Sequence, residues 1–315
     1  MSKPLVSVLI PTYNSEKYIE ETIESVLSQT FKDYEIIIVD NASTDNTYKL
    51  IKGYAEKYNK IKVFQNKTNI GPIKNWMRCI EEANGKYGKI LWSDDVIKDS
   101  FLKKAIPILE NDEDVGFVFT PAIIFGDVIK EKIFYNIAKN DGIFSTKNFI
   151  DGILFDKDYP NSPACALFRL SDLKKNLLLR IPNKFNSDAS IHAIGNDLLI
   201  FLLTAKDYKK FGYLSEPLSL FRAHNDSISI STKKTKMILN YDIAKAYFVE
   251  NFIYDKSIIE KYNAILWIHT KIFKTSKEIK QFYLKNQNYT KDYLFLLKNL
   301  FSSNSYFKRI KRKFF

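Results

Sequence analysis

Residues 6–14 read VSVLIPTYN, and residues 35–45 read EIIIVDNASTD. Each stretch is a short apolar run that ends in small and polar residues, the pattern of a buried strand followed by a loop. Residues 15–29 lie between them and carry apolar residues at helical spacing, with Ser15 as the expected N-cap. A strand, a helix and a strand in this order predict a βαβ crossover and a parallel sheet.

The alternation of strands and helices continues beyond these residues. Further helices are predicted over 44–58, 72–82 and 101–111, and further strands over 61–65, 90–92 and 115–120. Residues 121–232 mix short elements with loops, and the chain from Lys233 onward has the pattern of helices. We therefore expect an α/β fold with a mostly parallel sheet, flanking helices and a C-terminal helical region.

Charge and cysteine content restrict the partners and the compartment. The chain of 315 residues has a formal net charge of +12 and two cysteines, Cys79 and Cys165. The positive charge favours anionic partners, but no nucleic-acid motif accompanies it, so nucleic acid is not an expected partner. Two distant cysteines indicate a reducing compartment. With neither a signal peptide nor an apolar segment of about 18 residues, the sequence predicts a cytoplasmic protein, or one attached to a membrane from the cytosolic side.

Three polar clusters follow predicted strands, at residues 12–14, 40–45 and 93–95. The carboxyl ends of parallel strands meet at one edge of a sheet, where ligands bind in such folds. Asp94 and Asp95 repel each other unless a cation separates them, and Mg²⁺ or Mn²⁺ suits such a pair. The alternative interpretation is a solvated loop, or a cap for the helix near Ser100.

Asp40 closes a predicted buried strand. A carboxylate at that edge can accept the imide N3–H of uracil or thymine, whereas cytosine offers no such donor. The alternative is that Asp40 and Ser43 are only turn and cap residues.

The chain resembles the family 2 glycosyltransferases, which have a GT-A nucleotide-diphospho-sugar transferase fold and include bacterial surface-glycan enzymes. The resemblance rests on the two stretches quoted above, on Asn69-Ile70-Gly71 followed by a helix with Asn75, and on residues 83–87 leading into the acidic motif. It is dense over about residues 5–120. It implies a GT-A domain over 1–232, with a nucleotide-sugar half over about 1–120 and an acceptor half over about 121–232, and a helical C-terminal region over 233–315.

The resemblance also implies roles for individual residues. Positions implied to contact the nucleotide-sugar are Pro11, Thr12, Tyr13, Asn14, Asp40, Ser43, Asn69, Gly71, Asn75, Ser93 and Asp94. Asp95 is implied as a metal ligand, with His224 as a second candidate ligand. Arg222 is implied to contact the donor diphosphate or the acceptor.

Asp197 is implied as the general base that takes a proton from the acceptor hydroxyl. Without the resemblance, it would be a helix-start aspartate favoured by the helix dipole. Two nearby positions depart from the family pattern: Trp92 stands where the acidic motif often begins with aspartate, and Asn196 stands where a glutamate precedes the base.

The implied activity is inverting transfer of a hexose or N-acetylhexosamine from a UDP-sugar, or alternatively a dTDP-sugar, to a hydroxyl of a saccharide acceptor. Mn²⁺ or Mg²⁺ is the implied cofactor. The implied setting is the biosynthesis of cell-surface polysaccharide, lipopolysaccharide or lipooligosaccharide. The alternative, raised by Trp92 and Asn196, is a catalytically inactive nucleotide-sugar-binding relative.

The last ten residues, 306–315, hold five basic side chains and no acidic one. On a helix, Phe307, Ile310 and Phe314 would share one face, which is the layout of a short interfacial membrane anchor. Peripheral contact with the cytosolic face of the inner membrane would suit a lipid-linked saccharide acceptor. The alternative is a solvated C-terminus that keeps the protein soluble.

Overall fold

The computed structural model describes residues 3–128, 130–272, 277–285 and 290–295. The elements of the first part of the chain are β1 (Val6–Thr12), α1 (Ile19–Leu27), β2 (Tyr34–Asp40), α2 (Thr47–Lys57), β3 (Ile61–Gln65), α3 (Pro72–Glu82), β4 (Tyr87–Ile90), β5 (Val96–Ile97), α4 (Phe101–Asn111) and β6 (Val115–Phe119). The elements that follow are β7 (Ala122–Phe125), β8 (Lys132–Phe134), β9 (Gly142–Ser145), α5 (Thr146–Leu154), η1 (Pro163–Cys165), β10 (Ala166–Arg169), α6 (Leu170–Asn176), α7 (Ala189–His192), α8 (Asn196–Ala205), β11 (Lys210–Tyr213), β12 (Ser219–Arg222), α9 (Ile228–Ser231), α10 (Lys234–Phe252), α11 (Lys256–Ile272) and η2 (Ile279–Phe282).

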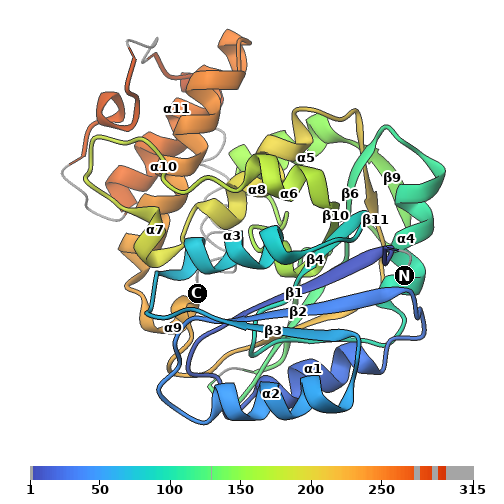
Figure 1. Ribbon diagram of the computed structural model, residues 1–315. Helices are drawn as coiled ribbons and strands as arrows, with labels where there is room; N and C mark the ends of the chain where they lie inside the picture. The colour runs from blue at the N-terminus through green and yellow to red at the C-terminus, as the bar shows by residue number, and fades with distance from the viewer. Residues whose placement is uncertain (1–2, 129, 273–276, 286–289, 296–315) are drawn as a thin grey trace.

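The larger sheet has the strand order β3-β2-β1-β4-β10-β6-β11-β9. β3, β2, β1 and β4 are parallel to one another, β10 is antiparallel to both of its neighbours, and β11 is parallel to β6. The predicted α/β fold with a mostly parallel sheet is therefore confirmed. Thr12 lies opposite Asp40 where β1 and β2 end. Because β1 begins at the right of Figure 1, the carboxyl ends of these strands face its left-hand side.

Helices cover both faces of the parallel strands, and this explains the continuous apolar run of β2. Ile36 and Ile38 belong to the hydrophobic cluster that includes α1 and α4 residues, whereas Ile37 and Val39 belong to the cluster that includes α3 and α8 residues. Successive side chains of a strand point to opposite faces, so a strand covered on both sides is apolar throughout. Figure 1 shows α1 and α2 below the sheet and α3 above it.

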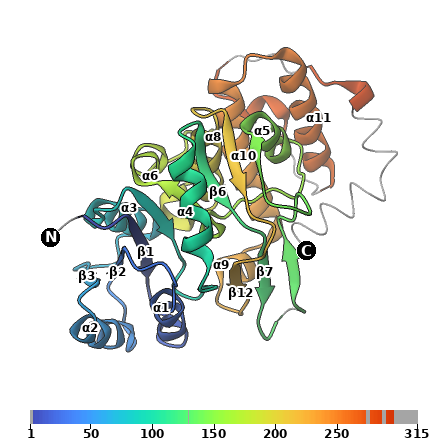
Figure 2. The ribbon, with the colours of Figure 1, turned by 90° about the vertical axis from the view of Figure 1, so that its right-hand side faces the viewer.

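A second sheet, which the sequence does not predict, has the strand order β5-β12-β7-β8. β12 is antiparallel to β5, with Ser219 opposite Ile97 and Leu220 opposite Val96. This pairing brings the residues at the end of β12 beside the loop that follows β4. Figure 2 shows β7 and β12 beneath α10.

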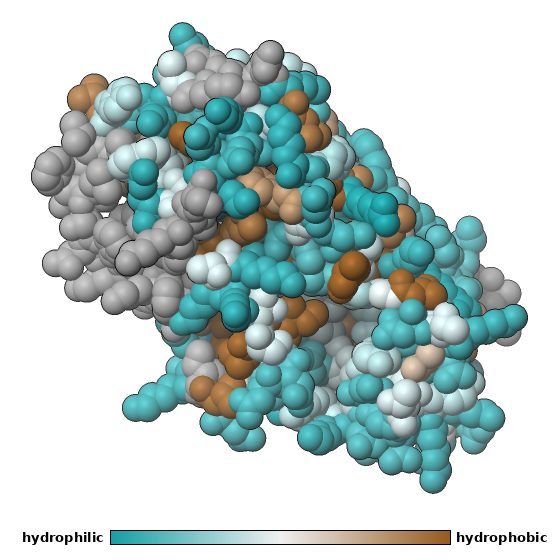
Figure 3. All heavy atoms as spheres, turned by 90° about the vertical axis from the view of Figure 1, so that its left-hand side faces the viewer, coloured by the Kyte–Doolittle hydropathy of each residue, from teal (hydrophilic) through white to brown (hydrophobic). Residues whose placement is uncertain are grey.

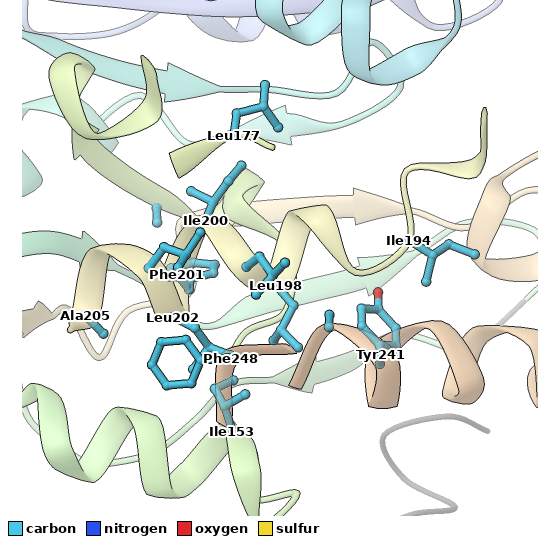
Figure 4. Packing of buried hydrophobic residues seen from close by; sticks show 14 of the residues in the cluster. Ile153, Leu177, Ile194, Leu198, Ile200, Phe201, Leu202, Ala205, Tyr241 and Phe248 are labelled. Atoms are coloured by element: carbon cyan, nitrogen blue, oxygen red, sulfur yellow. The ribbon is translucent and has the colours of Figure 1, made fainter. Parts of the chain in front are cut away.

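The C-terminal helices pack on the sheet domain through α8. Figure 4 shows Tyr241 and Phe248 of α10 against Leu198 and Leu202 of α8. All four side chains belong to one hydrophobic cluster, which also contains Phe117 of the large sheet. The expected helical region is therefore present, and the hydrophobic core continues across the boundary predicted between residues 232 and 233.

Buried ionic side chains join the segment after α5 to both C-terminal helices. Lys245 of α10 donates to Asp156 Oδ1 at 2.5 Å. His269 of α11 lies between two carboxylates, with Nδ1 2.9 Å from Asp242 Oδ2 and Nε2 3.1 Å from Asp156 Oδ2. All four side chains are buried. Burial opposes a charge on His269, but the two carboxylates outweigh burial and raise the pKa of His269 to about 9.

Several predicted element boundaries are wrong. The helix predicted over 44–58 is α2, which begins at Thr47. α1 begins at Ile19 rather than after Ser15, because residues 15–18 first form a turn on the Ser15 carbonyl. Ser15 is therefore not the N-cap. The strand predicted over 90–92 is β4, which begins at Tyr87 and ends at Ile90. The charged Lys89 conceals this strand in the sequence, although the side chain is fully buried in the structure.

Within the described residues, no helix is both long enough and apolar enough to cross a membrane. The tail predicted as an interfacial anchor, residues 306–315, lies outside the described residues.

Candidate functional site

Asp40 stands at the carboxyl end of β2, where the sequence predicts a nucleotide contact. Its buried carboxylate accepts hydrogen bonds from the Ser43 backbone N–H at 3.1 Å, from the Ser43 hydroxyl, and from Gln65 Nε2 at 3.0 Å. These bonds close the turn in which Ala42 has a left-handed φ of 61°. Asp40 therefore shapes the loop, as the alternative interpretation holds, and its contact with a base remains a prediction.

Asn14 ties the loop after β1 to the loop after β2. Its backbone N–H donates to Ser43 Oγ at 2.8 Å, and its Oδ1 accepts from the Thr44 N–H at 2.8 Å. Its φ of 49° lies in the left-handed region, which asparagine adopts more readily than most residues. Hydrogen bonds thus join the two loops into one rim at the sheet edge.

The end of β1 supplies three more of the expected residues. Pro11 lies within the strand, opposite Val39. The Thr12 hydroxyl is buried and has no partner among the described residues, and the Tyr13 side chain is 45% exposed. An unpaired buried hydroxyl costs about 1–3 kcal/mol, a cost that a ligand would remove by pairing with it.

Asn69, Gly71 and Asn75 form a layer beside this rim. Asn69 Oδ1 accepts from Asn41 Nδ2 at 2.9 Å and from the Gly71 N–H at 2.9 Å. Gly71 has a φ of 84°, and a Cβ there would meet the Ser190 carbonyl oxygen at 2.9 Å. Asn75 is buried and donates to the carbonyl of Val39 at 3.0 Å, so its amide supports the sheet edge from within the protein.

The acidic pair follows β4 and meets residues from β12. Asp94 Oδ2 lies 3.0 Å from His224 Nε2. Asp95 is buried, and its Oδ1 accepts from the Arg222 backbone N–H at 2.9 Å. Ser93 Oγ lies 2.7 Å from Ser15 Oγ. The structure thus brings Asp94, Asp95, Arg222 and His224 together, with His224 at Asp94 rather than at Asp95.

Charge is concentrated around this pair. Burial raises the pKa of Asp95 well above its ordinary value, and the neighbouring Asp94 carboxylate raises it further. The Arg222 guanidinium pairs with Glu21 and donates from Nε to the Asp94 carbonyl at 3.1 Å. The ring of Tyr18 lies 5.0 Å from the same guanidinium. The guanidinium therefore lies beside the acidic pair, and its contact with a diphosphate remains a prediction.

Asp94, Asp95 and His224 carry atoms of the kinds that bind divalent metal ions. Carboxylate oxygens suit Mg²⁺ and Mn²⁺, and imidazole nitrogen suits transition metals; Asp94 Oδ2 and His224 Nε2 contact each other directly at 3.0 Å. Among the described residues, no three His, Cys, Asp or Glu side chains converge to hold an ion by themselves. One or two carboxylates suffice for Mg²⁺ when substrate phosphates and water complete its shell.

Trp92 occupies the position at which the acidic motif departs from the family pattern. Its Nε1 donates to Ser162 Oγ at 3.1 Å, and its ring lies 4.5 Å from the ring of Trp76. The side chain is therefore fixed by one hydrogen bond and one aromatic contact, and it supplies no oxygen ligand.

Asp197 lies in the first turn of α8. Its Oδ1 accepts from the N–H groups of Gly195 and Leu198, each at 2.8 Å, and its Oδ2 accepts from the Tyr241 hydroxyl at 2.9 Å. Burial raises the pKa of Asp197 to about 7, although all three hydrogen bonds favour the ionised form. A carboxylate with a pKa near neutrality is suited to accept a proton at physiological pH.

Asn196 precedes this carboxylate and is fully buried. Neither atom of its side-chain amide has a hydrogen-bond partner among the described residues. The residue that departs from the family's glutamate is thus also an unsatisfied polar group beside Asp197.

Several residues of the site escape sequence analysis. Tyr241 reaches Asp197 from α10, and burial raises the pKa of both Tyr241 and Tyr135, with a further contribution from the Asp197 carboxylate. Tyr135 donates to Asn161 Oδ1 at 2.6 Å. No local pattern marks these residues, because each reaches the site from a different, distant segment. Glu21, the partner of Arg222, is concealed among the other acidic residues of α1.

The chain matches known protein families over its first half and beyond. Residues 7–177 match the family described as "Glycosyl transferase family 2". The chain is 29% identical to the putative teichuronic acid biosynthesis glycosyltransferase TuaG of Bacillus subtilis (strain 168), over 79% of this chain and 92% of TuaG. It is 40% identical over 185 residues to the poly(ribitol-phosphate) beta-N-acetylglucosaminyltransferase TarS of Staphylococcus aureus (strain Mu50 / ATCC 700699), which is 54% of this chain and 32% of TarS.

Other relatives match this chain over only part of their own length. An uncharacterized glycosyltransferase of Haemophilus influenzae is 28% identical over 50% of this chain and 57% of its own length. The chain spans about half the length of several curated relatives that it matches, with shares of 57%, 47% and 46%.

Solved structures share the fold. The crystal structure of S. aureus TarS 1-349 in complex with UDP-GlcNAc superposes with a TM-score of 0.65 at 22% identity, over 86% of this chain and 73% of that one. The complex of the same protein with UDP gives a TM-score of 0.61. This likeness confirms the GT-A architecture. Because residues 7–177 are more than half of the 315 residues, the match also settles the family: the chain belongs to glycosyl transferase family 2.

Proposed function

We propose that this chain transfers a hexose or N-acetylhexosamine from a UDP-sugar to a hydroxyl of a saccharide acceptor, with inversion at the anomeric carbon. The observation that carries the proposal is the Asp197 carboxylate, whose pKa burial raises to about 7 while two backbone N–H groups and Tyr241 fix its orientation. A carboxylate placed only to begin a helix needs neither the tyrosine nor the raised pKa.

Asp197 acts in the proposed reaction as the general base. It removes the proton of the acceptor hydroxyl as that oxygen attacks the anomeric carbon from the side opposite the leaving diphosphate. Tyr241 keeps Oδ2 in place through its hydroxyl, at 2.9 Å. Attack on one face and departure on the other give inversion, through a transition state with oxocarbenium character like that of glycoside hydrolysis.

Asp94, His224 and Arg222 are proposed to hold the diphosphate of the donor. When held at the acidic pair, with Asp95 as the predicted ligand and His224 as the second candidate, Mn²⁺ or Mg²⁺ would neutralise the charge that develops on the departing diphosphate. Asp95 accepts from the Arg222 backbone N–H and so keeps β12 beside the acidic pair. The Arg222 guanidinium adds a permanent positive charge at the same edge.

The nature of the donor and of the acceptor is supported by the relatives. TarS structures hold UDP-GlcNAc and UDP, and two relatives are named for teichuronic acid biosynthesis and for poly(ribitol-phosphate). We therefore propose a UDP-sugar donor and a cell-surface glycopolymer acceptor. The proposal includes a cytoplasmic location, which the free and buried Cys79 and Cys165 support. A lipid-linked acceptor and peripheral membrane contact through residues 306–315 rest on the sequence alone.

The experiment that tests the function is a screen of UDP-sugars with the full chain and Mn²⁺, in which released UDP is measured with and without saccharide acceptors. The wild type should release UDP with at least one donor, and Asp197→Asn should bind that donor without releasing UDP. The anomeric configuration of the product, read by nuclear magnetic resonance, tests inversion. If the chain binds a donor but releases no UDP with any of the acceptors, it is instead a catalytically inactive nucleotide-sugar-binding relative.

A further inference from the structure

A cavity of about 310 Å³ lies in the C-terminal region, between α11 and the turn that holds η2. It is outside the donor and base sites described above. Its walls include Trp267, Lys271, Lys277, Glu278, Lys280 and Lys291. Four of these six side chains are cationic and one is acidic, so the cavity is strongly positive.

Three of the four lysines carry charges that no carboxylate balances. Lys280 pairs with Glu278 at 2.8 Å. Among the described residues, by contrast, Lys271, Lys277 and Lys291 have no carboxylate within the distance of an ion pair. Lys277 and Lys291 are nevertheless half-buried. Partial burial of an unbalanced cation is unfavourable in the free protein, and an anion in the cavity would offset this cost.

Aromatic rings hold these ammonium groups at the cavity. Lys271 and Lys291 lie 5.8 and 5.4 Å from the centre of the Trp267 ring, and Lys277 lies 5.3 Å from that of Phe185. Cation–π contacts within about 6 Å restrain an ammonium group without neutralising it. The half-buried indole also gives the cavity an apolar wall, of the kind on which the C–H face of a sugar ring packs.

Contacts of Phe185 link the cavity to the segment that leads to Asp197. The Lys277 ammonium group lies over the ring of Phe185. Phe185 also packs on Phe282 of η2, with 4.8 Å between ring centres. Phe185 belongs to the segment that leads through α7 into α8, whose first turn holds Asp197. Figure 1 shows α10 and the turn of η2 above α7, on the side where the parallel strands end. Figure 3 shows this side of the molecule hollowed, with hydrophobic side chains along the hollow and hydrophilic ones around it.

We propose that this cavity is an accessory site for the acceptor, and that it binds phosphate or carboxylate groups carried by an acidic glycan. Three unbalanced ammonium groups recognise the anionic groups, and Trp267 contacts the sugar or polyol between them. The site would hold a polymeric acceptor at a distance from the reacting hydroxyl, so that short neutral acceptors gain nothing from it. The identification of the ligand as acceptor rests on the proposed function, whereas the binding itself does not.

The test is calorimetric binding of the full chain to three glycans of similar length: an oligogalacturonate, an oligo(ribitol phosphate) and a neutral maltooligosaccharide. At low salt, at least one of the acidic glycans should bind and the neutral one should not. Lys271→Gln/Lys291→Gln should weaken acidic binding at least about tenfold, the loss expected when a charge-assisted contact is removed. Added salt should weaken wild-type binding, because it screens exposed charges.

Lys49→Gln/Lys52→Gln is the matched control, because it removes the same charge from exposed positions of α2. It should leave glycan affinity within about twofold of wild type. Equal losses in the two double variants would mean that overall charge, not the cavity, attracts the glycan, and would overturn the proposal. No acidic binding by the wild type, or equal binding of the neutral glycan, would overturn it too.

Anionic vesicles and UDP provide the remaining comparisons. If binding to phosphatidylglycerol vesicles depends on Lys271 and Lys291 while binding to the glycans does not, the cavity serves a membrane surface and the proposal is wrong. Both double variants should bind UDP as the wild type does, since the cavity is separate from the donor edge. Glycan binding that requires the cavity, in a chain that turns over no UDP-sugar, would refute the proposed function and leave the binding site standing.

Discussion

The donor edge, which comprises residues 12–15, 40–45 and 93–95, differs in construction from the base site around Asp197. In the part of the donor edge formed by residues 12–15 and 40–45, neighbouring strands supply both partners of the contacts, as in the bonds of Asn14 to Ser43 and Thr44. At the base site, Asp197 meets Tyr241 from a helix 44 residues further along the chain. A site whose contacts come from neighbouring strands can be predicted from short sequence motifs. In a site assembled from distant segments, the sequence shows each residue only in isolation.

The loop at Asp40 and the base site also differ in how their polar groups are satisfied. The Asp40 carboxylate accepts from the Ser43 N–H, the Ser43 hydroxyl and Gln65, so it stabilises the loop. At the base site, the pKa of Asp197 is raised to about 7 by burial, and both amide atoms of Asn196 lack a partner among the described residues. We therefore expect substitutions at the base site to change the rate of transfer, and substitutions at the donor edge to change affinity and stability.

The largest effect is expected from Asp197→Asn. This variant keeps the shape of the side chain and removes its basicity, so kcat should fall by about 10²–10⁴-fold while UDP affinity stays near wild type. Asp188→Asn is the matched control, because Asp188 also begins a helix and accepts from the Ser190 N–H at 2.9 Å. A rate above half of wild type in Asp197→Asn would reduce Asp197 to a helix-start residue.

The second effect concerns the proposed metal. His224→Ala removes the nitrogen that lies 3.0 Å from Asp94 Oδ2. It should raise the Mn²⁺ concentration needed for half-maximal UDP release by about 10–100-fold, the range seen when groups around a metal are removed. His192→Ala serves as the control histidine. Wild-type turnover that persists undiminished in excess EDTA would contradict the metal-dependent mechanism.

A smaller effect is expected on the pH profile of Tyr241→Phe. The Tyr241 hydroxyl donates to Asp197 and so lowers its pKa, in opposition to burial. Because the base must be ionised, kcat should rise with pH through the pKa of Asp197, about 7 in the wild type. Loss of the hydrogen bond should move this midpoint upward by roughly half to one pH unit. An unchanged or lower midpoint would show that the tyrosine does not act on the base.

The smallest effect is expected at Asp40. If its carboxylate reads the imide N–H of uracil, the wild type should bind UDP about fivefold more tightly than CDP, the value of one hydrogen bond. Asp40→Asn should lose this preference, because its amide can donate as well as accept, and should also unfold at a lower temperature, because one neutral amide oxygen replaces the two carboxylate oxygens that accept from Ser43 and Gln65. Calorimetry with the two nucleotides measures the preference. Equal wild-type affinities would leave Asp40 with its structural role alone.

Much of the sheet domain could be predicted because its signals are local. The helices expected over 72–82 and 101–111 are α3 and α4 with the same bounds. The strand expected over 61–65 is β3. In each case, the spacing of apolar residues within the element, together with a proline or polar residue at or just before its start, was sufficient to predict the element.

The rest depends on contacts that no local pattern contains. The sequence offers no reason for β12 to pair with β5, yet this pairing carries His224 to Asp94. Lys89 conceals β4 because a charged residue seldom lies inside a sheet, whereas here it is fully buried and donates to the carbonyl of Ala164. Tyr241 likewise gives no sign of its role, since helix α10 has many aromatic and aliphatic residues of similar pattern.

The buried His269, bridged by Asp156 and Asp242, sets an alkaline limit on the folded state. Its pKa is about 9 in the folded protein, against an ordinary value of about 6.5. The stability that it contributes is therefore complete below about pH 6.5 and is lost as the pH rises through about 9. Above that pH the neutral imidazole leaves two buried carboxylates with Lys245 as their nearby cation. The attachment of α11, and with it one wall of the lysine-lined cavity, should loosen first in alkaline solution, which hydrogen exchange across this pH range would detect as faster exchange in α11 than in β1.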